Sequence, residues 1–474
     1  MRERSSLGFN FLMVFISNFI SLFKGIFVSI AVPKILSVDG YADYRIFTLY
    51  VSYVGLFHFG LLDGFCLKYA GKTVEQIKKE KIKTYTHILF WMEIVCSLLV
   101  LLIGSLINRR IDIIIICLSV DIVFHNLASF YQNVMQSTMQ FKKYARVGVL
   151  YSIFQIISVV VLLGLKTVNH ATGYSYIILY LICEFLMLMT CMLSIKGLVW
   201  GKVNYRLISY KELKEVISQG FMLLIGGLIV TLILNLDRQF VAVLFSKKEY
   251  AYYSFTYSIM NIVTSLITAM SIVLFPTLKR ASKNGQVAYY KKISCGIAVL
   301  VFGVLCFLPI MESIIVWILP KYRLSIDILY SIAPALATIC IIQVILINFF
   351  KTFKKTKEFC LYSIIALGIS FAFNYGAYVL FGTMSAIAIA TVLACLCWYV
   401  LCDRYLCRLM QLKNGLFIYV IFMTATYCLC YCDLLHVFYG MIGKALYMLI
   451  FALISAVFVK HEIYSPSAHS NIVS

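Results

Sequence analysis

Long apolar runs constrain the fold of this chain more than any other feature. Run after run of about 20 residues carries almost no charge, and a helix of that length crosses the roughly 30 Å hydrocarbon core of a bilayer. Lipid offers the backbone no hydrogen-bond partner, so only helices and closed barrels cross it. Barrel strands alternate apolar and polar residues over about ten positions, whereas these runs are continuous. The sequence therefore predicts membrane-spanning helices.

The low content of charged residues supports the same conclusion. Only 13% of the residues are charged and 62% are hydrophobic, with a mean hydropathy of +0.94. A soluble domain carries roughly 25% charged residues, and a soluble chain of 474 residues with so few charges would expose apolar surface to water. We predict an all-α polytopic membrane protein.

We predict 14 spans, each close to the length that the hydrocarbon core requires. A tight turn at Gly382-Thr383 separates the eleventh from the twelfth. The predicted spans are 9–30, 44–67, 86–107, 112–139, 147–165, 173–195, 217–245, 250–275, 294–316, 326–350, 359–381, 384–402, 416–432 and 438–459.

The basic residues are distributed unevenly between alternate loops. With the N-terminus placed in the cytoplasm, 29 of the 41 Lys and Arg residues lie on the inside and 10 on the outside. An excess of Lys and Arg in cytoplasmic loops sets the orientation of membrane proteins, and a wrong span count would blur this bias. The distribution predicts that both termini are cytoplasmic. It also accounts for the net charge of +21, so we expect no nucleic-acid partner.

Motifs for catalysis or metal binding do not stand out in the sequence. There is no Gly-rich phosphate loop followed by Lys-Ser or Lys-Thr, and no Ser/His/Asp or Cys/His arrangement. Nearly all of the 16 cysteines lie in apolar runs, where cysteine acts as a small hydrophobic residue. The predicted outer loops are only a few residues long. We therefore predict that the chain is not an enzyme and holds no cofactor or metal.

A short repeat divides the chain. Tyr41–Tyr44 (Tyr-Ala-Asp-Tyr) follows the first span and Tyr250–Tyr253 (Tyr-Ala-Tyr-Tyr) follows the seventh, 209 residues later. Six spans separate the copies, so both halves would begin on the same side of the membrane, as parallel repeats do. We predict a six-helix lobe over 1–200, a second six-helix lobe over 201–412, and two additional helices with a short cytoplasmic tail over 413–474.

The repeat and its surroundings resemble a known family. Residues 32–36 and 39–44 resemble the turn after the first helix of bacterial polysaccharide flippases, although Ser37-Val38 stands where many members have Leu-Gly. Residues 236–238, 249–254 and 275–278 are similar to the helix 7–8 region, and 382–386 with 390–392 to the helix 12 region. The chain resembles Wzx-type flippases for O-antigen and capsule repeat units. That group belongs to the multidrug/oligosaccharidyl-lipid/polysaccharide exporter superfamily.

The resemblance implies a function. Such a flippase moves an undecaprenyl-diphosphate-linked oligosaccharide across the bacterial inner membrane by alternating access, for O-antigen, capsule, exopolysaccharide or lipopolysaccharide assembly. It implies membrane lipids, a polysaccharide polymerase and a chain-length regulator as further partners, and a proton or sodium ion as the coupling ion. Two alternatives stay open: an ion-coupled small-molecule antiporter of the multidrug extruder type, and a polysaccharide polymerase. Multidrug extruders usually have twelve spans, and a polymerase should show a large outer loop.

Lys24 is a charged residue inside the first predicted span. A charge at a helix centre costs about 2.5–3.5 kcal/mol on insertion scales, so it requires a reason. Snorkelling to the outer interface is the alternative to a functional role. Flippases of the group that this chain resembles carry a cation on helix 1 facing a central cavity. The resemblance implies that Lys24 contacts the diphosphate of the lipid carrier.

The first lobe also carries acidic residues within its spans. Asp121 and Glu184 lie near the middle of the membrane, and either is a candidate ion-pair partner for Lys24. Three roles stay open for them: a structural ion pair, a proton or sodium relay, and contact with the substrate. His125 lies one turn after Asp121, and histidine is the side chain whose ordinary pKa lies near neutral pH. Asp121, His125, Gln132 and Gln136 follow at helical spacing, so we expect this stripe of span 4 to face a wet cavity. Asp63 and Glu93 lie nearer the cytoplasmic face and are expected to be solvated.

The second lobe carries Asp237 and Arg238 in the outer half of span 7. Adjacent residues on a helix point about 100° apart, so they need not pair with each other. Asp237 is a candidate for coupling and Arg238 for contact with the substrate diphosphate.

Pro309 and Pro334 fall inside predicted spans 9 and 10, where proline kinks a helix. These kinks are either hinges or packing features.

Overall fold

The computed structural model describes residues 2–107, 112–268, 274, 278, 282–412, 415–431 and 441–464. Every regular element among these residues is a helix, which confirms the predicted fold class. The chain divides into two compact units, a first unit over 1–231 and a second unit over 232–474. The division falls inside one continuous helix, α10 (Tyr210–Leu244). The predicted lobe boundaries at residues 200 and 412 stay a prediction.

The predicted number of spans is approximate. Among the described residues, 11 helices are long and apolar enough to cross a membrane, and a bent pair gives a twelfth. The two remaining predicted spans correspond to α11 (Lys247–Thr268) and α20 (Leu416–Tyr431). α20 has only 16 residues, and the segment after α11 lies outside the described residues, including positions 275–277 of the motif above.

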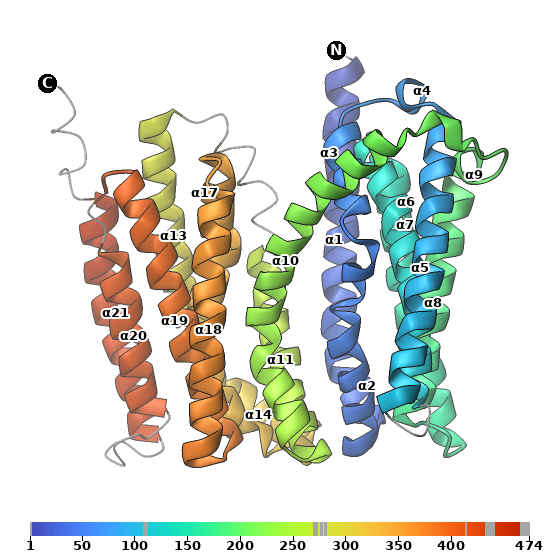
Figure 1. Cartoon of the computed structure of the whole chain (residues 1–474). Coiled ribbons are helices and arrows are strands. Elements are labelled where there is room, and N and C mark those ends of the chain that lie inside the picture. Colours follow the sequence, from blue (N-terminus) through green and yellow to red (C-terminus); the bar gives the residue numbers. More distant parts are fainter. Residues whose placement is uncertain are drawn as a thin grey trace, which may run out of the picture. The chain divides into compact units, whose positions relative to one another are not determined.

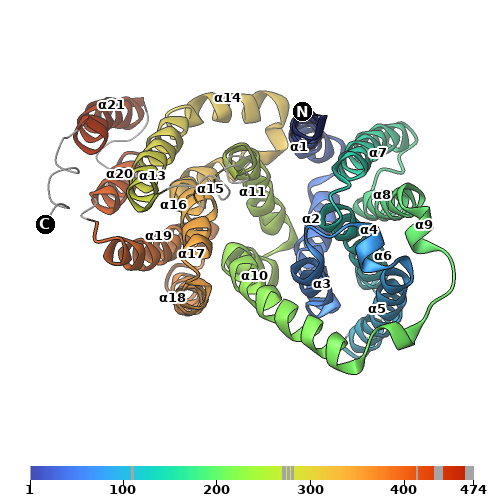
Figure 2. The same cartoon turned by 90° about the horizontal axis from the view of Figure 1, so that it is seen from above.

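The first unit is a bundle of long helices (Figures 1 and 2). α1 packs along α7, α7 along α8, α8 along α6 and α6 along α5. Each of these helices covers one of the predicted spans. The bounds are α1 (Arg2–Ile35), α5 (Lys79–Ile107), α6 (Ile113–Ser137), α7 (Phe141–Thr167) and α8 (Gly173–Ser194).

The second predicted span is broken rather than continuous. It consists of α2 (Val38–Val51), η1 (Val54–His58) and α3 (Leu61–Tyr69), with a bend of 58°. Phe59 and Gly60 both have positive φ, at 45° and 82°, which ends the helix. The pattern of apolar residues does not reveal such a break, because the residues on both sides of it are apolar.

Glycines let the broken span touch the backbone of α10. An added Cβ on Gly220 of α10 would lie 1.8 Å from the carbonyl oxygen of Gly60, and one on Gly64 would lie 1.9 Å from the oxygen of Val216. Small residues allow this close approach of two membrane helices. The N-terminal half of α10 is thereby packed tightly against α3 within the first unit.

Gly220→Ala tests this contact. We expect this substitution to lower the stability of the protein by about 1–3 kcal/mol, because an added methyl group forces the two backbones apart. The measurement is the apparent melting temperature of the purified protein in detergent. Gly227→Ala on the same helix is the matched control, since its added Cβ meets no atom of the described residues within 4 Å. Equal melting temperatures for the two variants would contradict the contact.

The second unit contains α11, α13 (Lys283–Leu305), α18 (Thr356–Phe381) and α19 (Met384–Leu409) (Figure 1). α18 and α19 pack side by side, joined by the predicted turn at Gly382, which has a positive φ of 61°. The Thr383 side chain accepts a hydrogen bond from the backbone of Ala386 and begins α19.

Two predicted spans of the second unit need correction. The apolar run predicts a continuous ninth span over 294–316, but α13 ends at Leu305 and the chain then turns into a separate short helix, α14 (Leu308–Ile318). Pro309 lies in the first turn of α14, where a missing N–H has little cost, so it begins a helix instead of kinking one.

The tenth predicted span is segmented. Pro334 separates α15 (Ser325–Ile332) from α16 (Ala335–Ile341), so the helix is interrupted at the proline where a kink is predicted. A π-helical turn, η4 (Ile342–Leu346), then leads into α17 (Ile347–Thr352).

The last two helices, α20 and α21 (Met441–Tyr464), dock on the second unit. Tyr427 of α20 donates a hydrogen bond to the carbonyl of Tyr330 at 3.1 Å, and Tyr447 of α21 donates to the carbonyl of Phe302 at 3.2 Å. Tyrosine hydroxyls buried in a bundle need such partners. Both helices are thus attached by specific polar contacts as well as by apolar packing.

Candidate functional site

Polar side chains from α1, α6, α7 and α8 converge inside the first unit. We call Lys24, Asp121, His125, Tyr151 and Glu184 the Glu184 cluster. Glu184 is only 2% exposed and accepts a short hydrogen bond from the Tyr151 hydroxyl. Its other carboxylate oxygen lies 3.7 Å from Nδ1 of His125. The cluster therefore brings together four of the six residues singled out from the sequence, with Tyr151 as an added member.

Lys24 reaches this cluster through an aromatic ring. Its Nζ lies 5.6 Å from the centre of the Tyr151 ring, within the range of a cation–π contact. Among the described residues Lys24 forms no ion pair with Asp121 or Glu184, although Glu184 is near enough to interact with it electrostatically. The side chain is half-buried. Its ammonium group thus keeps donors available for an anionic ligand.

Asp121 is the most isolated acid of the cluster. It is fully buried, and neither carboxylate oxygen has a hydrogen-bond partner among the described residues. The expectation that span 4 turns Asp121 toward a wet cavity is therefore wrong, because the side chain is enclosed within the bundle. His125, by contrast, has a side chain that is 36% exposed. Asp121 interacts electrostatically with both His125 and Glu184.

Glu93 contributes a second buried acid that we expected to be solvated. It is fully buried on α5 and accepts a 2.8 Å hydrogen bond from the side-chain amide of Asn126. The same amide donates to the carbonyl of Val54 at the break of the second span, at 3.1 Å. The expectation failed because a position along a span does not reveal which face of the helix is covered. Asn126 thereby connects Glu93 of α5 to the broken span.

A pocket of about 220 Å³ lies between the broken span and α10, within the first unit. His58 and Asp63 line it, with 4.0 Å between Nε2 and Oδ2. Nδ1 of His58 accepts a hydrogen bond from the backbone of Gly60 at 3.1 Å, so a neutral His58 carries its proton on Nε2, toward Asp63. The Asp63 side chain is 38% exposed, as expected of a solvated group. Most other lining residues are leucine and glycine.

The second unit holds its own buried acid, Asp237 on α10. It is 1% exposed and accepts hydrogen bonds from the hydroxyls of Tyr253, at 2.7 Å, and Tyr257. Its other oxygen accepts from the backbone N–H of Arg238 at 2.7 Å. The α10–α11 turn makes this possible, because Ser246 and Glu249 cap the start of α11 reciprocally. The Glu-Tyr-Ala-Tyr-Tyr motif therefore has two roles: Glu249 caps the start of α11, and the Tyr253 hydroxyl donates a hydrogen bond to the carboxylate of Asp237.

Arg238 stands apart from Asp237, as the helical spacing predicted. Its guanidinium group lies 4.5 Å from the centre of the Tyr257 ring. Nε of Arg238 is buried and has no hydrogen-bond partner among the described residues. Lys24 and Arg238 belong to different units, and each is a half-buried cation over a tyrosine ring. Nothing in the sequence indicated the tyrosine at either place.

Solved structures with the same fold are transporters by name. The chain is similar to a structure described as "Lipid II flippase MurJ, inward closed conformation", with a TM-score of 0.66, 16% identity, and coverage of 95% of this chain and 98% of that chain. It is also similar to an inward-facing multidrug resistance MATE family transporter of the MOP superfamily. That comparison has a TM-score of 0.59, 13% identity, and coverage of 87% and 95%. At these identities the likeness establishes the fold.

The sequence itself identifies the family. No curated protein matches it at a significant level. The family model described as "Polysaccharide biosynthesis protein" matches residues 65–322, from the broken span to the start of α15. Because this match covers more than half of the 474 residues, the chain belongs to the polysaccharide biosynthesis protein family, and it shares the fold of the two transporters named above.

Proposed function

We propose that this protein is a flippase for an undecaprenyl-diphosphate-linked oligosaccharide repeat unit. It moves this lipid from the cytoplasmic to the outer leaflet of the bacterial inner membrane by alternating access, for O-antigen, capsule or exopolysaccharide assembly. The observation that carries the proposal is Lys24, a half-buried cation on an apolar helix with no ion-pair partner among the described residues. The family match to polysaccharide biosynthesis proteins supports it.

The proposed role of Lys24 and Arg238 is to bind the diphosphate. A lysine offers three rotatable donors as a point charge, and an arginine offers a planar fork. Charge-assisted hydrogen bonds to phosphate are roughly twice as strong as neutral ones. Both cations rest on tyrosine rings, which support them without neutralising their charge. The sugars and the diphosphate would occupy the polar interior while the polyprenyl chain stays in lipid.

The proposed coupling residues are Asp121, His125, Glu184 and Asp237. Ionisable residues inside a bundle commonly mark proton or ion pathways. Neither buried oxygen of Asp121 has a hydrogen-bond partner in the part of the chain that the structure describes, and an unpaired buried charge is costly. A proton or a sodium ion bound beside it removes that cost. Lipid-linked oligosaccharide, membrane lipids, a polymerase and a chain-length regulator are the proposed partners.

A strain lacking the gene tests the proposed function. We expect lipid-linked repeat units to accumulate on the cytoplasmic leaflet and surface polysaccharide to disappear, because the synthesis of the repeat unit continues while its export stops. The measurement is extraction of undecaprenyl-diphosphate oligosaccharides, with surface polysaccharide followed in parallel. A complemented strain is the control. Unchanged surface polysaccharide without accumulation would refute the flippase proposal.

The second candidate is an ion-coupled antiporter for small molecules. The likeness to a multidrug transporter of the same superfamily favours it, as does the mainly apolar lining of the pocket beside His58 and Asp63. In that case the deletion strain would keep its polysaccharide and become more sensitive to lipophilic cations. The same strain therefore separates the two candidates.

A further inference from the structure

Two polar segments form one continuous end of the first unit. Residues 68–83 connect α3 to α5, and residues 196–214 connect α8 to α10 (Figure 1). The Thr84 hydroxyl donates to the carbonyl of Asn204 at 3.2 Å and accepts from its backbone N–H at 3.3 Å. Tyr205 and His87 form a further hydrogen bond. The second segment is thereby attached to the first turns of α5, directly after the first segment.

Apolar anchors hold both segments onto the bundle. Ile77 of the first segment, and Leu198 and Ile208 of the second, belong to the hydrophobic core of the unit and are 2%, 5% and 8% exposed. Burial of such side chains fixes the backbone between them. The polar residues on these segments therefore have defined positions on a built surface.

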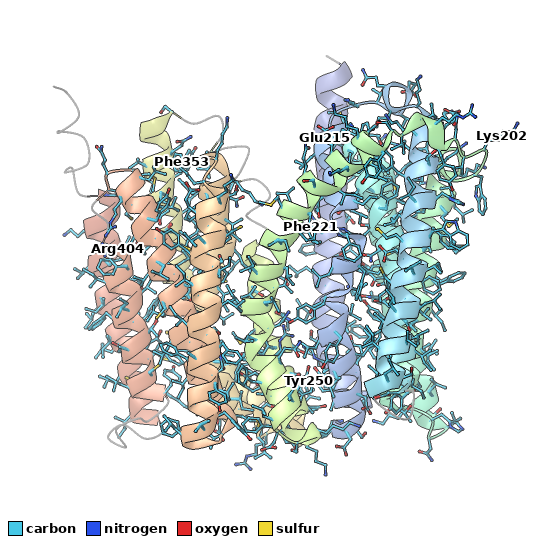
Figure 3. All side chains as sticks on the ribbon, in the orientation of Figure 1. Lys202, Glu215, Phe221, Tyr250, Phe353 and Arg404 are labelled. Carbon is cyan, nitrogen blue, oxygen red and sulfur yellow. The ribbon has the colours of Figure 1, made fainter. Side chains whose placement is uncertain are left out.

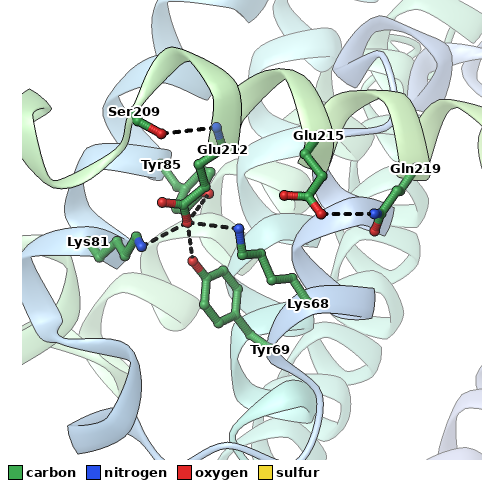
Figure 4. Close-up of polar contacts among 8 residues, drawn as sticks. All are labelled: Lys68, Tyr69, Lys81, Tyr85, Ser209, Glu212, Glu215 and Gln219. Carbon is green, nitrogen blue, oxygen red and sulfur yellow. Dashed lines mark hydrogen bonds and ion pairs between the residues drawn. The ribbon is translucent and has the colours of Figure 1, made fainter.

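Glu212 joins the two segments at their centre (Figure 4). One of its carboxylate oxygens accepts from Lys68 at 3.1 Å and Lys81 at 2.7 Å. The same oxygen accepts from the hydroxyls of Tyr69 at 2.8 Å and Tyr85 at 3.2 Å. Four donors on one oxygen make Glu212 a fixed centre around which the other basic residues are arranged.

The remaining basic residues of these segments have no acidic partner of their own within hydrogen-bond distance among the described residues. The segments contain eleven Lys and Arg residues but only three acids, Glu75, Glu80 and Glu212. Figure 3 shows Lys202 at the outer edge of this end of the unit. We call the following residues the basic face: Lys72, Lys78, Lys79, Lys83, Lys196, Lys202, Arg206, Lys211 and Lys214.

Exposed aromatic residues accompany the basic face. Trp200, Tyr205 and Tyr210 are 66%, 54% and 82% exposed. Tryptophan and tyrosine concentrate at the level of the lipid headgroups, where an apolar ring meets polar surroundings. The distribution of basic residues predicts that this end of the unit is cytoplasmic. Basic residues and interfacial aromatics together fit an anionic membrane surface better than a soluble acidic partner.

We propose that the basic face binds the phosphate headgroups of anionic phospholipids in the cytoplasmic leaflet. The lysines and Arg206 contact the headgroups while Trp200 and Tyr210 lie among them. Juxtamembrane basic segments are attracted to anionic leaflets, and the attraction falls off within a Debye length. The binding holds the start of α10, through Glu212, at a constant depth. This inference rests on the predicted topology and does not depend on which substrate is transported.

Hydrogen exchange of the intact protein in lipid nanodiscs tests the proposal. We expect residues 68–83 and 196–214 to exchange at least about twofold more slowly in phosphatidylglycerol discs than in phosphatidylcholine discs. The triple variant Lys202→Gln, Arg206→Gln, Lys211→Gln should lose this difference. The matched control removes three lysines from the second unit: Lys351→Gln, Lys354→Gln, Lys357→Gln. It should keep the difference.

Four outcomes would overturn the proposal. Equal exchange of the wild-type protein in both kinds of disc would show that the headgroup charge has no effect. Loss of the difference in both variants would assign it to overall charge. Equal protection by soluble pyrophosphate in phosphatidylcholine discs would indicate a site for free phosphate groups.

If the triple variant fails to fold, as judged by exchange in α6, a salt titration of the wild type replaces it. Protection should fall as salt rises, because salt screens exposed charges, and a salt-independent difference would refute the proposal.

Discussion

Cells whose only copy of this protein carries Lys24→Ala are expected to stop exporting polysaccharide and to accumulate the lipid-linked repeat unit. Loss of one partner from a buried, charge-assisted contact costs about 2–5 kcal/mol, which corresponds to a loss of binding of at least roughly 30-fold. The Tyr151 ring would remain, since its hydroxyl is held by Glu184. The measurement is the rate of surface polysaccharide formation at equal protein levels in the membrane.

Two variants control this experiment. Lys24→Arg keeps the positive charge over the Tyr151 ring and should retain part of the activity, although its donors have a different geometry. Lys166→Ala removes an exposed lysine from the last turn of α7 and should leave export unchanged. Full activity of correctly inserted Lys24→Ala protein would eliminate the proposed contact with the diphosphate.

Asp237→Ala is expected to destabilise the second unit strongly. It leaves the hydroxyls of Tyr253 and Tyr257 without their acceptor, and both tyrosines are buried. Each unpaired buried donor costs about 1–3 kcal/mol. A total near 3 kcal/mol corresponds to a decrease of roughly 6–12 °C in melting temperature for a unit of this size. The measurement is the thermal stability of the purified protein in detergent.

Smaller substitutions measure how much each hydrogen bond of Asp237 contributes to the stability of the second unit. Tyr253→Phe removes one donor and leaves Asp237 with Tyr257 and the backbone of Arg238, so we expect a smaller loss of stability. Asp237→Asn keeps one acceptor oxygen but turns the other into a donor that faces the existing donors, so we expect an intermediate loss. A melting temperature of Asp237→Ala equal to that of the wild type would show that these hydrogen bonds do not stabilise the unit.

The motif at residues 249–254 illustrates how local signals predict and where they stop. The sequence placed it correctly after span 7, because the end of an apolar run and a capping residue are local features. Its contact with Asp237 was not predicted, since that contact depends on how α11 packs against α10. A residue pair 16 positions apart meets only after the chain has turned.

The broken second span is the clearest departure from the pattern of apolar residues. Length and hydropathy placed it in the membrane, but the bend at Phe59 and Gly60 depends on partners far away in the chain. Asn126 satisfies the carbonyl of Val54, and Gly220 admits the backbone of Gly60. Without those partners the unsatisfied backbone groups would make a break in lipid costly.

The sequence by itself determined that this chain is an all-helical membrane protein with about fourteen spans, because the cost of burying backbone and charge in lipid acts on each segment separately. It also identified Lys24, Asp121, His125, Glu184, Asp237 and Arg238 as unusual, since each is a titratable group at depth. Only the tertiary structure decided that Tyr151 lies between Lys24 and Glu184, that Asp121 and Glu93 are buried, and that Asp237 is held by two tyrosines. These contacts depend on how each helix is rotated about its axis relative to its neighbours. The sequence does not reveal this rotation, because a helix face that contacts lipid and one that contacts protein are both apolar.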